Sequence, residues 1–158
     1  MSASTSATDQ PTGRSRPQID PRGARFAAVL TTVLLAVALL LAPSAATVAL
    51  LAVQGVVFAV GALRGVQHTP YSLAFRRLVR PRLGPPAELE DAAPPRFAQT
   101  VGLGFTVVAL AGYLLGVDLL GSIATGFALA AAFLNAAFGL CLGCEVYLLL
   151  RRAAPLTR

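Results

Sequence analysis

Hydrophobic residues make up 56% of this 158-residue chain, charged residues only 13%, and the mean hydropathy is +0.70. Soluble domains carry about 25% charged residues, so the composition excludes an ordinary soluble protein and indicates an integral membrane protein. All 13 basic residues are arginines that flank apolar stretches, so the partner we expect is a lipid bilayer and not nucleic acid.

The first apolar stretches predict one transmembrane hairpin. Residues 1–19 are rich in Ser, Thr, Pro and Gln and predict a disordered cytoplasmic tail, so the fold is expected to start at Asp20. Apolar runs then cover 26–42 and 46–63, each close to the roughly 20 residues that a spanning helix needs. A cleaved secretory signal is an alternative for the first run. A cleaved signal would not account for the second, similar hairpin that follows later in the chain.

The connection after this hairpin predicts a short amphipathic helix at the membrane interface. Four apolar residues recur at the spacing i, i+3, i+4, i+7, and three arginines occupy the other side of the same helix. A merely solvated run of arginines is the alternative. The residues are Tyr71, Ala74, Phe75 and Leu78 on the apolar side, and Arg76, Arg77 and Arg80 on the charged side.

The second half of the chain repeats the first. Two further apolar runs, Gln99–Gly116 and Leu119–Leu140, predict a second hairpin. The segment DAAPPRFA at 91–98 matches DPRGARFA at 20–27 in the placement of its Asp and its Arg-Phe-Ala. Both halves contain an even number of spans, so the two halves have the same orientation in the membrane.

The predicted fold class is an all-α membrane protein with four transmembrane helices in two repeated hairpins, plus the short interfacial amphipathic helix. The four-helix domain covers 20–153, with repeat halves at about 20–82 and 91–152, and a cytoplasmic tail follows at 154–158. Every arginine lies in the tails or the long connection, and none lies in the turns between paired helices. The positive-inside rule therefore predicts a multi-pass protein of the cell (inner) membrane with both termini cytoplasmic.

The motif FGLCLGCEVY at the end of the fourth run carries the candidate chemistry. About 20 residues at 1.5 Å rise bring this helix from the outer turn to the cytoplasmic interface near Cys141 and Cys144. Gly139 and Gly143 flank Cys141, so the helix is expected to break and restart there. A new helix N-terminus favours the thiolate form of a cysteine placed on it. In a redox couple, Cys141 would be the attacking thiolate and Cys144 the resolving thiol.

Two other interpretations of the cysteines stay open. They could be two metal ligands, with Glu145 or His68 completing a partial shell, or two small residues that pack a helix end. The repeat puts His68 on the same membrane face as Cys141, where its imidazole would stabilise a thiolate, accept its proton or bind a metal. The alternative is an interfacial loop position in which His68 faces water. Asn135 and Gln54 lie inside spans and are expected to face the bundle, where they bond each other or line a polar path to the cysteines.

Three segments, DPRGARFA, SLAFRRLVRPRLGPPAELEDAAPPRFAQ and FLNAAFGLCLGCEVYLLLRR, together resemble the bacterial membrane-protein family catalogued as domain of unknown function 4395. The resemblance covers about residues 18–153. Members are often encoded beside thioredoxin-like and sulfurtransferase-like proteins, so the resemblance implies thiol or sulfane-sulfur traffic. Only Cys141 and Cys144 carry over as candidate functional residues.

These observations predict a membrane thiol-redox or sulfur-relay protein, similar to a thiol–disulfide oxidoreductase, with a soluble thioredoxin-like or sulfurtransferase-like partner. Two alternatives remain. The first is a transporter of a small sulfur compound, which would have to be an oligomer because four short helices leave little room for a pore in one chain. The second is a non-catalytic membrane scaffold. The sequence leaves open whether the chain forms a homo-oligomer and whether it uses a cofactor.

Overall fold

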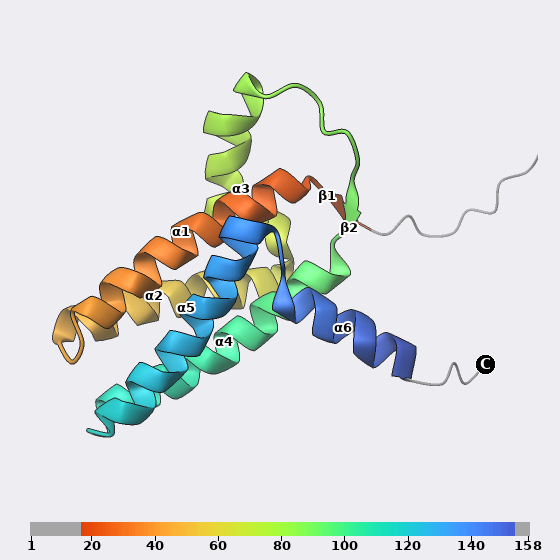
Figure 1. Cartoon of the computed structure of the whole chain (residues 1–158). Helices are drawn as coiled ribbons and strands as arrows, with labels where there is room; N and C mark the ends of the chain where they lie inside the picture. The colour runs from red at the N-terminus through yellow and green to blue at the C-terminus, as the bar shows by residue number, and fades with distance from the viewer. Residues whose placement is uncertain (1–16, 154–158) are drawn as a thin grey trace, which may run out of the picture.

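Four long helices form the body of the protein. The computed structural model describes residues 17–153 and shows α1 (Pro21–Leu40), α2 (Ala45–Arg64), α4 (Ala93–Leu114) and α5 (Asp118–Phe138) packed as a bundle (Figure 1). Each of the four is long and apolar enough to cross a membrane. The predicted all-α fold of two hairpins is therefore confirmed. Most of the two predicted tails, 1–16 and 154–158, lies outside the described residues.

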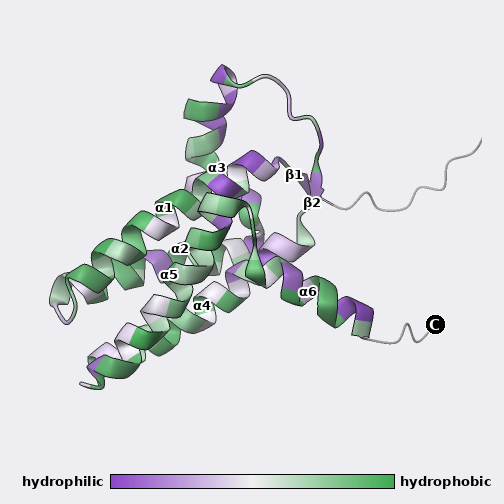
Figure 2. Ribbon diagram, in the orientation of Figure 1, coloured by the Kyte–Doolittle hydropathy of each residue, from purple (hydrophilic) through white to green (hydrophobic). Residues whose placement is uncertain are grey.

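The two tight turns, α1 to α2 and α4 to α5, lie at one end of the bundle, and the shorter elements lie at the other (Figure 1). Apolar residues run along the long helices, whereas hydrophilic residues gather around the shorter elements (Figure 2). We call this second end the polar end. Its elements are β1 (Gln18–Ile19), η1 (Val66–His68), α3 (Pro70–Ala74), η2 (Phe75–Val79), η3 (Arg80–Arg82), β2 (Glu90–Asp91) and α6 (Leu142–Ala153).

Equivalent aspartates start the first helix of each hairpin. The carboxylate of Asp20 accepts the backbone N–H of Arg22 at 3.0 Å, and the carboxylate of Asp91 accepts that of Ala93 at 2.9 Å. A side-chain acceptor at this position pairs an N–H group that a helix start leaves open. Both helices therefore begin several residues before the apolar runs that predicted them.

Equivalent arginines hold the two hairpins to each other at the polar end. Arg96 of α4 donates to the carbonyl oxygens of Ala62 and Leu63 at the end of α2, at 2.7 and 3.0 Å. Arg25 of α1 donates to the two equivalent carbonyl oxygens at the end of α5, both at 3.5 Å. These carbonyls have no partner inside their own helices, and a helix C-terminus favours a cation. The sequence repeat is thus also a repeat of contacts.

A two-residue antiparallel pairing links the starts of the two hairpins. Gln18 pairs with Asp91, and Ile19 pairs with Glu90. The sequence assigns Gln18 and Ile19 to the tail, because strands this short show no periodicity that could reveal them. The pairing brings the starts of α1 and α4 to the same place.

The predicted interfacial helix is helical throughout, but its geometry changes along its length. It starts as α-helix in α3, widens to a π-helical turn in η2 and tightens to 3₁₀ in η3. Phe75 is buried and packs on Phe26 of α1, with ring centroids 5.8 Å apart. Leu78, predicted on the same apolar side, is 65% exposed. The π-helical turn changes the 3.6-residue spacing of a regular helix within this segment.

Small residues fill most of the bundle core. Close approach of membrane helices depends on such residues, since lipid offers no hydrophobic drive for helices to associate. Gly112 of α4 lies directly against Gly121 of α5, where an added Cβ would collide with backbone. The core cluster consists of Leu35, Ala38, Leu51, Ala109, Ala124 and Ala128.

Candidate functional site

A cleft of about 640 Å³ opens at the polar end. It lies between the starts of α1 and α4, the helical segment from η1 to η3, and the loop after α5. Cys141, Cys144 and Asn135 line this cleft. It is the candidate site, because it brings both predicted cysteines to an opening with charged walls.

The chain breaks and restarts as predicted between α5 and α6. Gly139 ends α5 with a φ of 71°, a left-handed conformation that glycine adopts without strain. Cys141 then stands immediately before the first residue of α6. Its sulfur accepts the backbone N–H of Cys144 at 3.4 Å, and its carbonyl oxygen accepts that of Glu145 at 3.0 Å. Cys141 therefore caps the N-terminus of α6.

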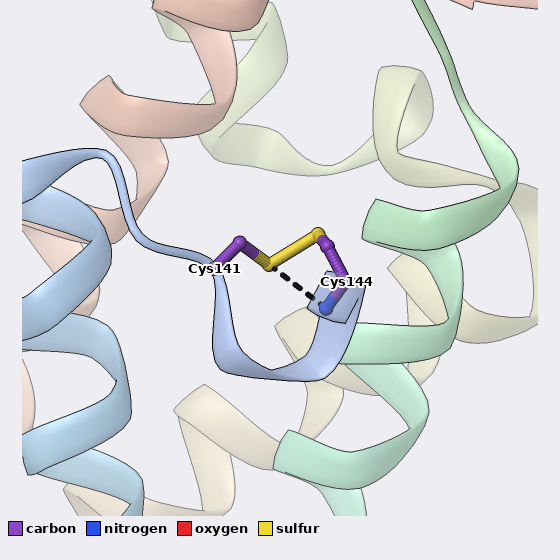
Figure 3. Close-up of a disulfide and its surroundings, with 2 residues drawn as sticks. All are labelled: Cys141 and Cys144. Atoms are coloured by element: carbon purple, nitrogen blue, oxygen red, sulfur yellow. Dashed lines mark hydrogen bonds between the residues drawn. A yellow bond between two sulfur atoms is a disulfide. The ribbon is translucent and has the colours of Figure 1, made fainter. Parts of the chain in front are cut away.

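A disulfide joins Cys141 to Cys144, whose Cα atoms are 5.2 Å apart (Figure 3). Figure 3 shows the bridge running from the loop after α5 to the first turn of α6. Both cysteines are partly buried, and both line the cleft. A bridge that closes so short a loop restrains the unfolded chain little, so its contribution to stability is small. Its position on the wall of a cleft suits exchange chemistry.

Gly143 holds the motif tightly against α4. A Cβ added to Gly143 would lie 2.6 Å from the Cβ of Ala98 and 2.7 Å from its Cα. One turn further along α6, the ring of Tyr147 packs on Phe97 of α4 with centroids 5.7 Å apart. The second of the two residues between the cysteines is therefore glycine, because the backbones of α6 and α4 lie against each other there.

The other predicted site residues lie in different surroundings. Asn135 is half-buried and lines the cleft. His68 is exposed, and its Nδ1 lies 2.8 Å from the carbonyl oxygen of Arg64. Glu145 is exposed in the first turn of α6. Neither His68 nor Glu145 is among the residues that line the cleft. Within residues 17–153, no three His, Cys, Asp or Glu side chains gather into a group that could hold a metal ion.

Gln54 is fully buried and ties three helical segments together. Its carbonyl oxygen accepts the hydroxyl of Tyr71 at 2.9 Å, and its amide nitrogen donates to the hydroxyl of Thr31 at 3.4 Å. Burial raises the pKa of Tyr71, so its hydroxyl stays protonated and donates. The hydrogen bonds of Gln54 thus go to α1 and α3, and none of those described goes to Asn135.

Sequence reasoning missed two glutamines of the cleft, Gln67 and Gln99. Gln67 follows Gly65 by two residues, as Cys141 follows Gly139, so the repeat itself was the signal for Gln67. In both glutamines the side-chain carbonyl oxygen is buried and has no hydrogen-bond partner among the described residues. Their amide nitrogens likewise make no hydrogen bond in the described part of the chain, so they are donors available to a ligand.

Positive charge dominates the cleft. Arg22 is paired with Asp20, at 3.0 Å between Nη2 and Oδ2. The hydrogen bond from the Arg22 side chain holds the pKa of Asp20 below its usual range. Glu90 is the other carboxylate among the lining residues. Three further arginines line the cleft, Arg25, Arg76 and Arg80, so arginines outnumber the two lining carboxylates, Asp20 and Glu90. The charge of Arg80 also contributes to the lowered pKa of Asp20.

A family model described as Domain of unknown function (DUF4395) matches residues 19–152, a range that includes the four long helices and both cysteines. No curated protein and no solved structure matches the chain.

Proposed function

This chain belongs to the family described as Domain of unknown function (DUF4395), and we propose that it carries out thiol–disulfide exchange with a soluble thioredoxin-like protein. One observation carries the proposal: the Cys141–Cys144 disulfide lines an open cleft at the polar end of the bundle, whose four long helices are apolar enough to cross a membrane. A purely structural bridge would gain nothing from that position.

The compartment follows from the distribution of arginine. All described arginines lie in or beside the elements of the polar end, and the turns at the opposite end contain none. By the positive-inside rule, this distribution supports a cytoplasmic position for the polar end and for both cysteines. The cytosol keeps thiols reduced, so a disulfide there belongs to a pair that cycles between two states.

The exchange balances without a further reactant. A partner thiolate attacks one sulfur of the Cys141–Cys144 bridge, the bridge breaks, and the other cysteine leaves as a thiolate. The second partner thiol then attacks the mixed disulfide. The partner dithiol becomes a disulfide, and the cysteine pair gains two electrons and two protons. In the reverse direction Cys141 attacks, because the N–H of Cys144 and the N-terminus of α6 stabilise its thiolate.

The test traps the mixed disulfide. A Cys144→Ser variant in membranes should form a covalent adduct with a thioredoxin whose resolving cysteine is replaced by serine and whose remaining cysteine is activated as a mixed disulfide with 2-nitro-5-thiobenzoate. The thiolate of Cys141 attacks the thioredoxin sulfur and releases nitrothiobenzoate, and the new mixed disulfide persists because neither protein has a second thiol to resolve it. The matched Cys141→Ser variant should form less adduct. If neither variant forms an adduct, and reduced thioredoxin leaves the wild-type disulfide intact, the proposed function is wrong.

The same variants separate the rival functions. A sulfurtransferase-like partner would instead leave a persulfide on Cys141, which mass spectrometry detects as one added sulfur. A scaffold would keep its cellular role in the Cys141→Ser/Cys144→Ser variant at normal expression. A transporter would show counterflow of a labelled sulfur compound in vesicles. Reporter fusions after Arg82 and Arg158 test the sidedness, and both should give a cytoplasmic signal.

A further inference from the structure

The walls of the cleft offer hydrogen-bond donors and positive charge next to the disulfide. Arg76 and Arg80 line the cleft, are exposed, and make no side-chain hydrogen bond within residues 17–153. Gln67 and Gln99 also line the cleft, and the amide nitrogen of each makes no hydrogen bond in the described part of the chain. Of the two carboxylates that line the cleft, Asp20 is paired with Arg22, and Glu90 forms no ion pair with an arginine within residues 17–153. The arginines outnumber the carboxylates, so the cleft favours an anion.

The size of the cleft selects a small molecule. Sites for small ligands typically enclose about 300–1,000 Å³, and this cleft encloses about 640 Å³. Both sulfur atoms belong to residues on its wall, so a molecule held there would lie beside the bridge. The ligand must then combine a negative charge with a group that reacts with a disulfide.

We infer that the cleft binds a small anionic thiol, one that carries a carboxylate, and that this thiol exchanges with the Cys141–Cys144 bridge. The inference rests on the proposed function and names a second, low-molecular-weight substrate for the same site. The first thiolate attacks a bridge sulfur and releases the other cysteine as a thiolate; a second thiol attacks the mixed disulfide. Two thiols become one disulfide, and the bridge becomes two cysteine thiols.

The test compares three thiols of similar size and different charge. The oxidised full-length protein, in nanodiscs of zwitterionic lipid, is reduced with 3-mercaptopropionate, 2-mercaptoethanol or cysteamine. Each rate constant is divided by the rate of the same thiol on a small neutral disulfide, which removes differences in thiolate fraction and nucleophilicity. A positively charged cleft should favour the anionic thiol over the neutral one by about tenfold or more, and the preference should shrink with added salt.

The chain supplies a matched pair of variants. Arg76→Gln/Arg80→Gln removes two arginines that line the cleft, whereas Arg77→Gln/Arg82→Gln removes two arginines of the same helical segment that do not line it. The first variant should lose most of the preference, and the second should keep it. Propionate, which has the charge but no thiol, should slow reduction of the wild-type protein by 3-mercaptopropionate and leave reduction by 2-mercaptoethanol less affected.

The outcomes separate this inference from the proposed function. Equal normalised rates for the three thiols, or equal loss in both double variants, would refute the anionic-thiol site while leaving exchange with a thioredoxin intact. A bridge that neither thioredoxin nor any of the thiols reduces would refute both. If the Arg76→Gln/Arg80→Gln variant does not fold, propionate competition on the wild-type protein still decides the question.

Discussion

Replacing Gly143 by alanine should push α6 away from α4. The new Cβ would lie 2.6 Å from the Cβ of Ala98 and 2.7 Å from its Cα. Carbon atoms in contact pack at about 3.5–4.0 Å, so the two helices must separate by about 1 Å. Overpacking of this kind costs about 1–3 kcal/mol. At about 2–4 °C per kcal/mol for a chain of this size, Tm should fall by roughly 2–12 °C.

The displacement should also reach the disulfide, because Cys144 is the next residue along α6. We expect the redox equilibrium of the Cys141–Cys144 pair with a thiol buffer to shift, together with the Tm in detergent. Gly126→Ala is the matched control, since nothing lies within 4 Å of a Cβ added there. A Gly143→Ala protein with unchanged Tm and unchanged redox equilibrium would show that the α6–α4 contact does not position the motif.

Three further predictions concern the contacts that hold the polar end together. Arg96→Gln should lower stability by about 1 kcal/mol, because the last turn of α2 loses a charged hydrogen-bond donor. The effect stays small because Arg96 is exposed to solvent, and Tm in detergent measures it. Gln54→Leu should cost about 1–3 kcal/mol by leaving the Tyr71 hydroxyl unpaired, and adding Tyr71→Phe should recover part of that loss in a double-mutant cycle. The hydrogen bond from Arg22 lowers the pKa of Asp20 in the folded protein. The pairing therefore stabilises the fold at pH values above the ordinary carboxyl pKa, and this stabilisation is lost as the pH falls through the lowered pKa. The Tm difference between wild type and Asp20→Asn should therefore narrow at acid pH, and a pH-independent difference would contradict the pairing.

The spans, the repeat and the helix break could be predicted because each depends on local sequence. A run of about 20 apolar residues predicts a membrane helix whatever its neighbours are. Gly139 ends α5 through its own backbone preference, and the aspartates at 20 and 91 start α1 and α4 by bonding residues two positions away. The position of Cys141 before a new helix follows from the same local signals.

The walls of the cleft could not be predicted, because they come from segments that are far apart in the chain. Gln99 and Arg76 show no pattern of their own, and they become part of a site only when α4 and the helical segment after α2 pack at the polar end. The π-helical turn at Phe75–Val79 could not be predicted either, because the spacing of apolar residues there is that of a regular helix. His68 was placed near Cys141 by analogy between the halves, but the side chain at that point of the first half that lines the cleft is Gln67.

The two equivalent arginine contacts become possible at different times while the protein is being synthesised. Arg96 follows its acceptors by 34 and 33 residues, so those carbonyls are already made when it leaves the ribosome. Arg25 precedes its acceptors by 111 and 112 residues and waits for the end of α5. The same stretch of chain then delivers Cys141, so the contact between α1 and the end of α5 forms only when the cysteines are made. The cysteine pair consequently lies in the last segment to join the bundle, and a nascent chain that stalls before α5 contains no thiol.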